Sequence, residues 1–267
     1  MDKHRFAAAL LWDCAESGRF IDGLADDIRP TTRSEGYAVQ AQWPIVSGER
    51  VVGWKIAATS QAGREHIGVS GPLAGRILNS RVYADGSEVP SLGNGMRVAE
   101  PEFGFAMARD LAPRGSAYTV DEVLDAVDCV FPSIELPSSR FADFVRAGEG
   151  QLLADNACAG RFVFGARRRV NGPQLDLGRH EVRGTVERNG TTVLERLGTG
   201  TAVLGDPRAA LAWLVNEVNR LGLTLRAGHV VSTGTCMVPM PIEPGDIVRA
   251  DYGALGRVAL TFVDHGR

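Results

Sequence analysis

Two glutamates stand two residues apart in the segment 98–105, VAEPEFGF. Alternate side chains of a β-strand share one face, so Glu100 and Glu102 point one way while Phe103 and Phe105 point the other way, into the core. Two like charges this close repel each other unless one is protonated or a cation lies between them. The spacing therefore indicates either a cation site or an acidic sheet face in solvent.

A third carboxylate, Glu135, lies in the apolar run 129–136. Its neighbours Ile134 and Leu136 are expected to face the core, so Glu135 faces away from them. Three carboxylates leave coordination positions for water and a chelating substrate, which suits a hard ion such as Mg²⁺ or Mn²⁺. No cluster of His and Cys residues argues for zinc. On spacing alone, the metal site and the solvated acidic face stay equally open.

Lys55 lies in the apolar segment 51–58, and Lys3 is the only other lysine among 29 basic residues. An ammonium can lose its proton far more readily than a guanidinium can. We therefore take Lys55 as a candidate catalytic residue that positions a substrate carboxylate or moves a proton. The alternative is a lysine at a strand end with its ammonium in solvent.

Candidate substrate-binding residues lie in two further segments. Thr233, Gly234 and Thr235 offer two hydroxyls and a backbone N–H to a substrate oxygen, with a tight turn between strands as the alternative. Asn156 is a candidate for contact through the water shell of a metal, and local backbone capping is its alternative.

The N-terminal half of the chain alternates helical and strand patterns. Helices are predicted over 4–17 and from Thr32, with Glu35 in capping-box spacing, to Pro44. A short helix capped by Ser60 follows, and the capping box of Thr119 and Glu122 opens another. The remaining predictions are strands over 51–58, 77–82, 98–107 and 129–136, and a helix over 138–147.

The C-terminal half is dominated by strand patterns, over 161–164, 181–188, 191–196, 230–233, 246–251 and 257–263. Asn189-Gly190 indicates a type I′ hairpin, and Asp206 with Pro207 begins a helix that ends at Gly222. The sum predicts an α+β fold with a largely antiparallel or mixed sheet. We expect a helical N-terminal segment, 1–48, followed by a catalytic domain, 49–267.

Composition excludes several classes of function. The chain has 267 residues and a net charge of −3, so nothing indicates nucleic acid or an anionic membrane as its partner. No apolar stretch is long enough to span a bilayer, and the N-terminus lacks the features of a signal peptide. Its four cysteines are widely spaced and form no C-x-x-C motif. We therefore expect a cytoplasmic protein in a reducing compartment.

The motifs together resemble the fumarylacetoacetate hydrolase superfamily, in its branch of 2-oxo-4-pentenoate hydratases and 4-oxalocrotonate decarboxylases. The match begins near residue 50 and runs in order to the C-terminus. It is carried by Glu100-x-Glu102 with Glu135, Gly53-Trp54-Lys55-Ile56 with Thr59-Ser60, Ile67-Gly68-Val69 with Pro72 and Gly75, Ala154-Asp155-Asn156, Val231-Ser232-Thr233-Gly234-Thr235, and Pro244-Gly245-Asp246.

The resemblance implies a mixed, rolled, barrel-like β-sheet with flanking helices and a helical lead-in. It implies that Glu100, Glu102 and Glu135 hold Mg²⁺, which chelates the 1-carboxylate and 2-oxo group of a small 2-oxo acid, and that Lys55 lies in the active site. The implied enzyme is a lyase of aromatic compound catabolism: a hydratase of a 2-hydroxy-2,4-dienoate, of the 2-oxopent-4-enoate type. A homo-oligomer is implied, and so is association with a partner enzyme of the pathway.

Other activities share this chemistry. A 4-oxalocrotonate-type decarboxylase and a C–C bond hydrolase also place an electron sink at the 2-oxo oxygen. The sequence departs from many hydratases, which carry acids near Ser70 and at Asn79 and Ser80. The Glu-His pair of C–C hydrolases is not visible, which weighs against that activity. A non-catalytic scaffold subunit is a further alternative, and the intact carboxylates and lysine speak against it.

Overall fold

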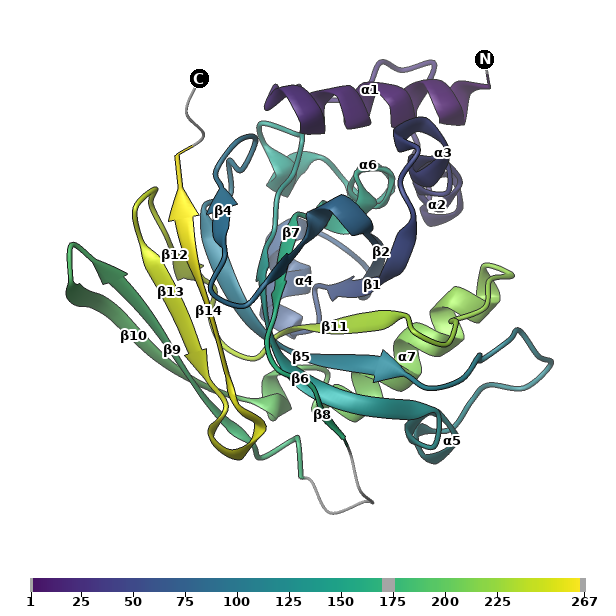
Figure 1. The fold of residues 1–267 in the computed structure, drawn as a ribbon. Coiled ribbons are helices and arrows are strands. Elements are labelled where there is room, and N and C mark those ends of the chain that lie inside the picture. The colour runs from purple at the N-terminus through teal and green to yellow at the C-terminus, as the bar shows by residue number, and fades with distance from the viewer. Residues whose placement is uncertain (1, 170–175, 265–267) are drawn as a thin grey trace.

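Two β-sheets of mixed strand direction form the body of the protein, with helices around them (Figure 1). The computed structural model describes residues 2–169 and 176–264. The first sheet has the strand order β2-β1-β11-β5-β6-β7-β3, with β12 paired to β5 and β8 paired to β6. The second sheet has the order β10-β9-β13-β14-β4.

The strands are β1 (Val51–Ala57), β2 (Leu73–Leu78), β3 (Val82–Ala84), β4 (Glu88–Pro90), β5 (Val98–Met107), β6 (Val127–Leu136), β7 (Arg161–Phe164), β8 (Arg168–Arg169), β9 (Glu181–Arg188), β10 (Thr191–Thr199), β11 (Val230–Thr235), β12 (Met240–Pro241), β13 (Ile247–Asp251) and β14 (Arg257–Val263). The helices are α1 (Lys3–Ser17), α2 (Arg33–Gln40), α3 (Trp43–Ser47), α4 (Gln61–Ile67), α5 (Val120–Leu124), α6 (Glu149–Ala154) and α7 (Pro207–Arg220).

The first sheet curls, and the second sheet stands beside it (Figure 1). β1 pairs with β11 and β3 with β7 in parallel, whereas β5 pairs with both β6 and β11 in antiparallel fashion. β5 is buried along almost its whole length on both faces, because curling makes the concave face an interior. The predicted α+β fold with a mixed, rolled sheet and flanking helices is confirmed.

Three predicted elements differ from the structure. The helix predicted over 138–147 is wrong: the described chain there is irregular apart from an isolated bridge of Phe141 to Ile21 and one 3₁₀ turn at Phe144–Arg146, and α6 begins only at Glu149. Ser139 and Arg140 are instead tied to Asp155 by side-chain and backbone hydrogen bonds, which competes with helix formation. The predicted strand 77–82 is split by a 3₁₀ turn, Asn79–Arg81.

Pro44, expected to end a helix, instead lies in the first turn of α3, where its missing N–H costs nothing. The helix caps at Thr32, Ser60, Thr119 and Asp206 are confirmed, and each side chain accepts a hydrogen bond from a backbone N–H of its helix. The capping box at Thr119 is complete, whereas Glu35 accepts from the N–H of Thr31 and leaves the box at Thr32 half formed.

The N-terminal helices pack against the first sheet and α6. Trp43 Nε1 donates to the carbonyl of Ala154 at 2.8 Å, and Gln40 Nε2 donates to the carbonyls of Ala74 and Leu153 at 2.8 and 3.2 Å. α1 covers α2, α3 and the 136–160 region at one end of the molecule (Figure 1). None of the helices in the described ranges has the length and hydrophobicity to cross a membrane.

Candidate active site

The three predicted metal-binding glutamates meet on adjacent strands. Glu100 on β5 lies directly opposite Glu135 on β6 in the antiparallel register, and Glu102 lies opposite Ser133. One carboxylate oxygen from each glutamate lies within 4.8 Å of the others. The pairing of β5 with β6 thus brings the two glutamates of one strand and the single glutamate of the next strand together as a candidate site for a cation.

This site is buried. Glu102 and Glu135 have no exposed surface, and Glu100 is partly exposed. Burial raises the pKa of all three carboxyls, and the adjacent Glu102 helps to raise the pKa of Glu100 to about 7. Such burial excludes the alternative of a solvated acidic face.

Unsatisfied oxygens show that a cation fits here. Oε1 of Glu102 and both carboxylate oxygens of Glu135 are buried and accept no hydrogen bond from the described residues. Buried carboxylates without donors are rare, because each loses its hydration without replacement. An all-oxygen donor set of three carboxylates is typical of sites for hard divalent ions, which would compensate both the charge and the missing contacts.

Lys55 is the buried cation beside this cluster. Its Nζ lies 3.2 Å from Glu135 Oε2, an ion pair without hydrogen-bond alignment, and donates to the carbonyl of Ala157 at 3.2 Å. Burial lowers the pKa of Lys55, but the carboxylates of Glu135, Glu102 and Glu100 outweigh burial, so its pKa is raised. With its side chain 2% exposed, Lys55 is not a strand-end lysine in solvent.

Asn156 supports the backbone that holds Lys55. Its Oδ1 accepts from the N–H of Arg76 at 2.7 Å and its Nδ2 donates to the carbonyl of Arg76 at 2.9 Å. Asn156, Ala157 and Cys158 have φ of 54°, 54° and 57°, a left-handed run that non-glycine residues rarely adopt. The oxygen and the nitrogen of the Asn156 side-chain amide are thus both bonded to the backbone of β2, so this placement favours a structural role over substrate contact.

The segment 233–235 divides between structural and cavity-facing positions. Thr233 is fully buried and donates to a backbone carbonyl of β5 at 3.0 Å. Gly234 and Thr235 line the cavity described below. Gly234 has φ of +95°, and a Cβ added there would lie 2.6 Å from Thr59 Oγ1, so only glycine fits this position in β11. Of the three candidates, Gly234 and Thr235 are placed where a substrate oxygen could reach them.

Sequence reasoning missed two residues that orient Glu102. Ser232, opposite Lys55 in the parallel register of β1 and β11, donates its hydroxyl to Glu102 Oε2. Tyr252 Oη donates to the backbone carbonyl of Glu102 at 2.7 Å. Ser232 belongs to the motif Val231-Ser232-Thr233-Gly234-Thr235, which is a signal for its role, whereas nothing near Tyr252 in the sequence points to this contact.

A cavity of about 910 Å³ opens over the cluster, a size typical of small-molecule sites. Glu100, Lys55, Gly234 and Thr235 belong to its lining, and most of the rest is apolar. The apolar part of the wall consists of Ile56, Ala57, Ala58, Ala62, Ile67, Met96, Val98, Pro137, Phe144, Leu197, Ala202, Met237, Val238 and Pro239. This arrangement suits a substrate with a polar head and an apolar body.

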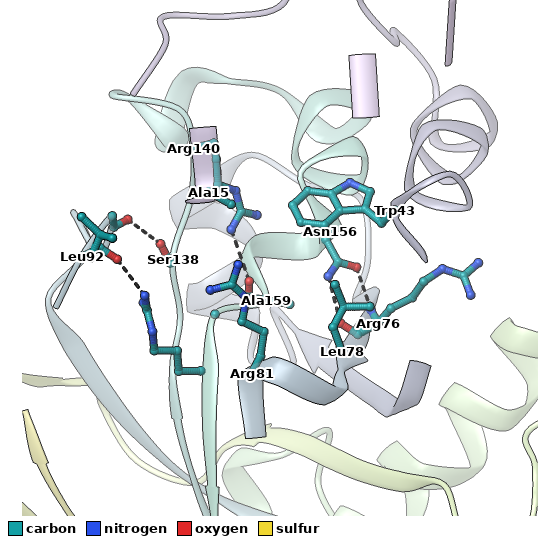
Figure 2. Close-up of a pocket in the computed structure, with 13 residues that line it drawn as sticks. Ala15, Trp43, Arg76, Leu78, Arg81, Leu92, Ser138, Arg140, Asn156 and Ala159 are labelled. Carbon is teal, nitrogen blue, oxygen red and sulfur yellow. Dashed lines mark hydrogen bonds between the residues drawn. The ribbon is translucent and has the colours of Figure 1, made fainter. Parts of the chain in front are cut away.

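A second, much smaller pocket lies among arginines, where α3, β2 and the 138–161 region meet (Figure 2). Figure 2 shows Asn156 bonded to Arg76 and Arg140 bonded to Ala159 there. Its volume of about 20 Å³ admits little more than an ordered water. We therefore place the candidate active site in the large cavity.

The positions that depart from the hydratase pattern lie at the surface. Ser70 is exposed, and both its N–H and its hydroxyl donate to Glu149 Oε1, at 3.0 and 2.9 Å. Arg33 binds the same carboxylate oxygen at 2.6 Å. An acid therefore does stand beside Ser70 in space, but it is paired with an arginine and is not part of the cavity lining. Asn79 accepts a hydrogen bond from Arg50 instead.

Known proteins resemble the whole chain. It is 33% identical to the 2-keto-4-pentenoate hydratase of Paraburkholderia xenovorans over 96% of this chain and 93% of that protein. It is 30% identical to the 2-oxo-hept-4-ene-1,7-dioate hydratase of Escherichia coli, over 98% and 99%. The solved 4-oxalocrotonate decarboxylase from Pseudomonas putida G7, complexed with magnesium and adipate, superposes with a TM-score of 0.84 at 28% identity and 97% coverage of both chains. No family model matches the chain.

The chain belongs to the 2-keto-4-pentenoate hydratase and 4-oxalocrotonate decarboxylase family. Its members named as hydratases and decarboxylases are lyases, and the chain is a lyase of this family. The predicted fumarylacetoacetate hydrolase-type fold is confirmed by the solved structures that it resembles.

Proposed function

We propose that the protein is a Mg²⁺-dependent hydratase of a 2-hydroxy-2,4-dienoate of the 2-oxopent-4-enoate type. The observation that carries this proposal is the cluster of Glu100, Glu102, Glu135 and Lys55, because Glu100 and Lys55 of this cluster also line the large cavity. The hydratases among its relatives support the choice of reaction. Held by the three carboxylates, Mg²⁺ would supply Lewis acidity at the 2-oxo oxygen of the substrate.

The protein's own residues would position the substrate and move protons. Lys55, as an ammonium, can bind the substrate carboxylate or deliver a proton to carbon as the dienol ketonises. Ser232 keeps one oxygen of Glu102 fixed, and the carbonyl of Ala157 keeps the ammonium of Lys55 in place. The apolar walls exclude bulk water from the reactive enone, which strengthens these electrostatic contacts.

A decarboxylase acting on a 4-oxalocrotonate-type 2-oxo acid is the second candidate. The close superposition on a solved decarboxylase favours it. Departure of CO₂ needs the same electron sink at the 2-oxo oxygen, so Glu100, Glu102 and Glu135 would serve both reactions.

We also propose that the protein acts in the cytoplasm as a homo-oligomer and that Mn²⁺ can replace Mg²⁺. All four cysteines are free thiols, which fits a reducing compartment. Residues 1–48 would form a helical segment that supports the catalytic domain of residues 49–267, in line with the contacts from Trp43 and Gln40.

The test is the loss of dienol ultraviolet absorbance from 2-hydroxypenta-2,4-dienoate, with Mg²⁺ and again with EDTA. We expect Mg²⁺-dependent loss with 4-hydroxy-2-oxopentanoate as the product. Turnover that releases CO₂ from a 4-oxalocrotonate-type substrate, without hydration of the dienoate, would replace the hydratase by the decarboxylase.

A further inference from the structure

Few charged residues line the cavity, and Lys55 and Glu100 among them belong to the cluster. Lys55 is the only lysine or arginine among the described residues that line it, and its ammonium is already engaged by Glu135 and by a backbone carbonyl. The acids in the lining are Glu100, at the cluster, and Glu181, at the exposed start of β9. Beyond the cluster the wall therefore offers no arginine or lysine to a second anionic group.

Outside the cluster, most side chains that line the cavity are apolar. Leu197 on β10 and Val238 in the loop after β11 belong to its lining and are 73% and 68% exposed, so they form the rim. His66 lies on the same wall and packs edge-on against Phe144, with ring centroids 6.1 Å apart. Arg64, on the same helix, donates to the carbonyl of Thr59 and is not in the lining.

We propose that this site takes 2-oxo acids with a single carboxylate and an uncharged tail, and that it discriminates against dicarboxylates. This inference rests on the proposed function, which places the 2-oxo acid head at Lys55 and the three glutamates. A carboxylate at the far end of the tail would lose hydration against apolar walls without gaining a lysine or arginine partner, and Glu181 in the same lining would repel it. Relatives include enzymes named for substrates of both classes, so the family alone does not decide this point.

The first experiment measures binding of matched unreactive ligands by calorimetry with Mg²⁺. 2-Oxohexanoate and 2-oxohexanedioate share the head and chain length and differ in the terminal group. We expect 2-oxohexanoate to bind at least about tenfold more tightly, since an unpaired buried charge costs more than one decade in affinity. Equal or tighter binding of the dicarboxylate would overturn the inference.

Turnover separates this inference from the proposed function. We expect kcat/KM for 2-hydroxyhexa-2,4-dienoate to exceed that for 2-hydroxyhepta-2,4-diene-1,7-dioate by at least about tenfold. If neither dienoate is hydrated but 2-oxohexanoate is still the preferred ligand, the proposed hydratase fails while the preference for an uncharged tail stands. Faster turnover of the dicarboxylate would overturn the preference and leave the hydratase intact.

A rim variant tests where the tail lies. Val238→Arg brings a guanidinium to the cavity mouth. It should reduce the ratio between the affinities of the two ligands by about three- to tenfold. Val193→Arg is the matched control, because Val193 is also an exposed valine, 52% exposed on β10, but does not line the cavity. If both variants gained the same affinity for the dicarboxylate, the added positive charge would act at long range. That result would contradict a tail that lies at Val238.

Discussion

At the scale of single residues, Glu102 and Glu135 are exceptional because they are carboxylates with no exposed surface and with oxygens that accept no hydrogen bond from a described residue, Glu135 being ion-paired with Lys55 alone. Removing an ion from water costs several kcal/mol unless another charge or donor replaces the hydration. One ammonium, on Lys55, faces three carboxyls whose pKa values are raised by burial, so without a metal the cluster can keep all three ionised only at a cost. This cost is the physical reason for expecting a divalent cation.

Glu102→Gln should abolish the metal-dependent activity without unfolding the protein. We expect turnover to fall more than about a hundredfold and the metal-free melting temperature to stay level or rise, because one buried charge is gone. Mg²⁺ with oxalate should stabilise the wild type by about 2.7 kcal/mol at a hundred times the dissociation constant, and should not stabilise the variant.

The control for this variant is Glu195→Gln, which makes the same change at a half-exposed carboxylate on β10. We expect the melting temperature and the Mg²⁺-dependent kinetics of this control variant to equal those of the wild type. Full Mg²⁺-dependent turnover in Glu102→Gln would remove Glu102 from the metal site.

Lys55→Met should separate catalysis from metal binding. Loss of the ammonium removes the proton donor and the partner of the substrate carboxylate, so kcat should fall at least about a hundredfold. Stabilisation by Mg²⁺ should persist, because the three carboxylates remain. Lys3→Met, at the only other lysine, is the control. A kcat of the Lys55→Met variant equal to that of the wild type would show that Lys55 does not act in the reaction.

At the scale of elements, the site depends on four adjacent strands in register. β1, β11, β5 and β6 stand side by side, and their pairing puts Lys55 opposite Ser232 and Glu100 opposite Glu135. A slip of one residue in any pair would turn a functional side chain to the opposite face of the sheet. Gly234, at an irregularity in the pairing of β11 with β5, lets the strand pass close to Thr59 without a side chain between them.

Gly234→Ala should lose more stability and activity than Gly245→Ala. Both glycines have nearly the same positive φ, +95° and +98°, so the backbone strain of an alanine should cost the same stability at either position. A Cβ at 234 meets Thr59 Oγ1 at 2.6 Å, whereas a Cβ at 245 meets no atom within 4 Å. We expect Gly234→Ala to be about 1–3 kcal/mol less stable in urea denaturation, the usual cost of overpacking. Equal losses would show that the contact with Thr59 relaxes freely.

At the scale of the whole molecule, segments that are distant in the sequence contact the backbone around Ala157, whose carbonyl accepts a hydrogen bond from Lys55. Asp155 is ion-paired with Arg140, Asn156 is bonded to both backbone groups of Arg76, and Trp43 of α3 holds the carbonyl of Ala154. The left-handed run that follows is strained by itself, so surrounding contacts must maintain it. The N-terminal helices thus reach the site through the 154–158 backbone.

Trp43→Phe should destabilise the protein through that backbone. It leaves the buried carbonyl of Ala154 without its donor, which costs about 1–3 kcal/mol. Trp12→Phe is the matched control, since Trp12 packs edge-on against Trp43 at 5.8 Å and donates no hydrogen bond to any described residue. Equilibrium unfolding of both variants distinguishes the lost hydrogen bond from lost aromatic packing. Equal losses would rule out a special role for the Ala154 contact.

Much of the fold and of the candidate site could be predicted from local sequence patterns. Alternation along 98–105 and 129–136 put Glu100, Glu102 and Glu135 on the face opposite the aromatic and aliphatic core residues, because side-chain direction in a strand depends only on position. Helix caps at Thr32, Ser60, Thr119 and Asp206 depend on residues three or fewer positions apart, so they too were predictable. The ordered motifs also led to the correct family.

Only the tertiary structure decided whether the carboxylates were buried, since curling of the sheet makes one face an interior and no local pattern reports curvature. It also committed Asn156 to β2 and Thr233 to β5, contacts that join residues 80 and 130 positions apart. The failed helix over 138–147 has the same cause, because Asp155 competes for its backbone and side chains from outside the segment. Local sequence sets where side chains point, and long-range packing sets what they meet.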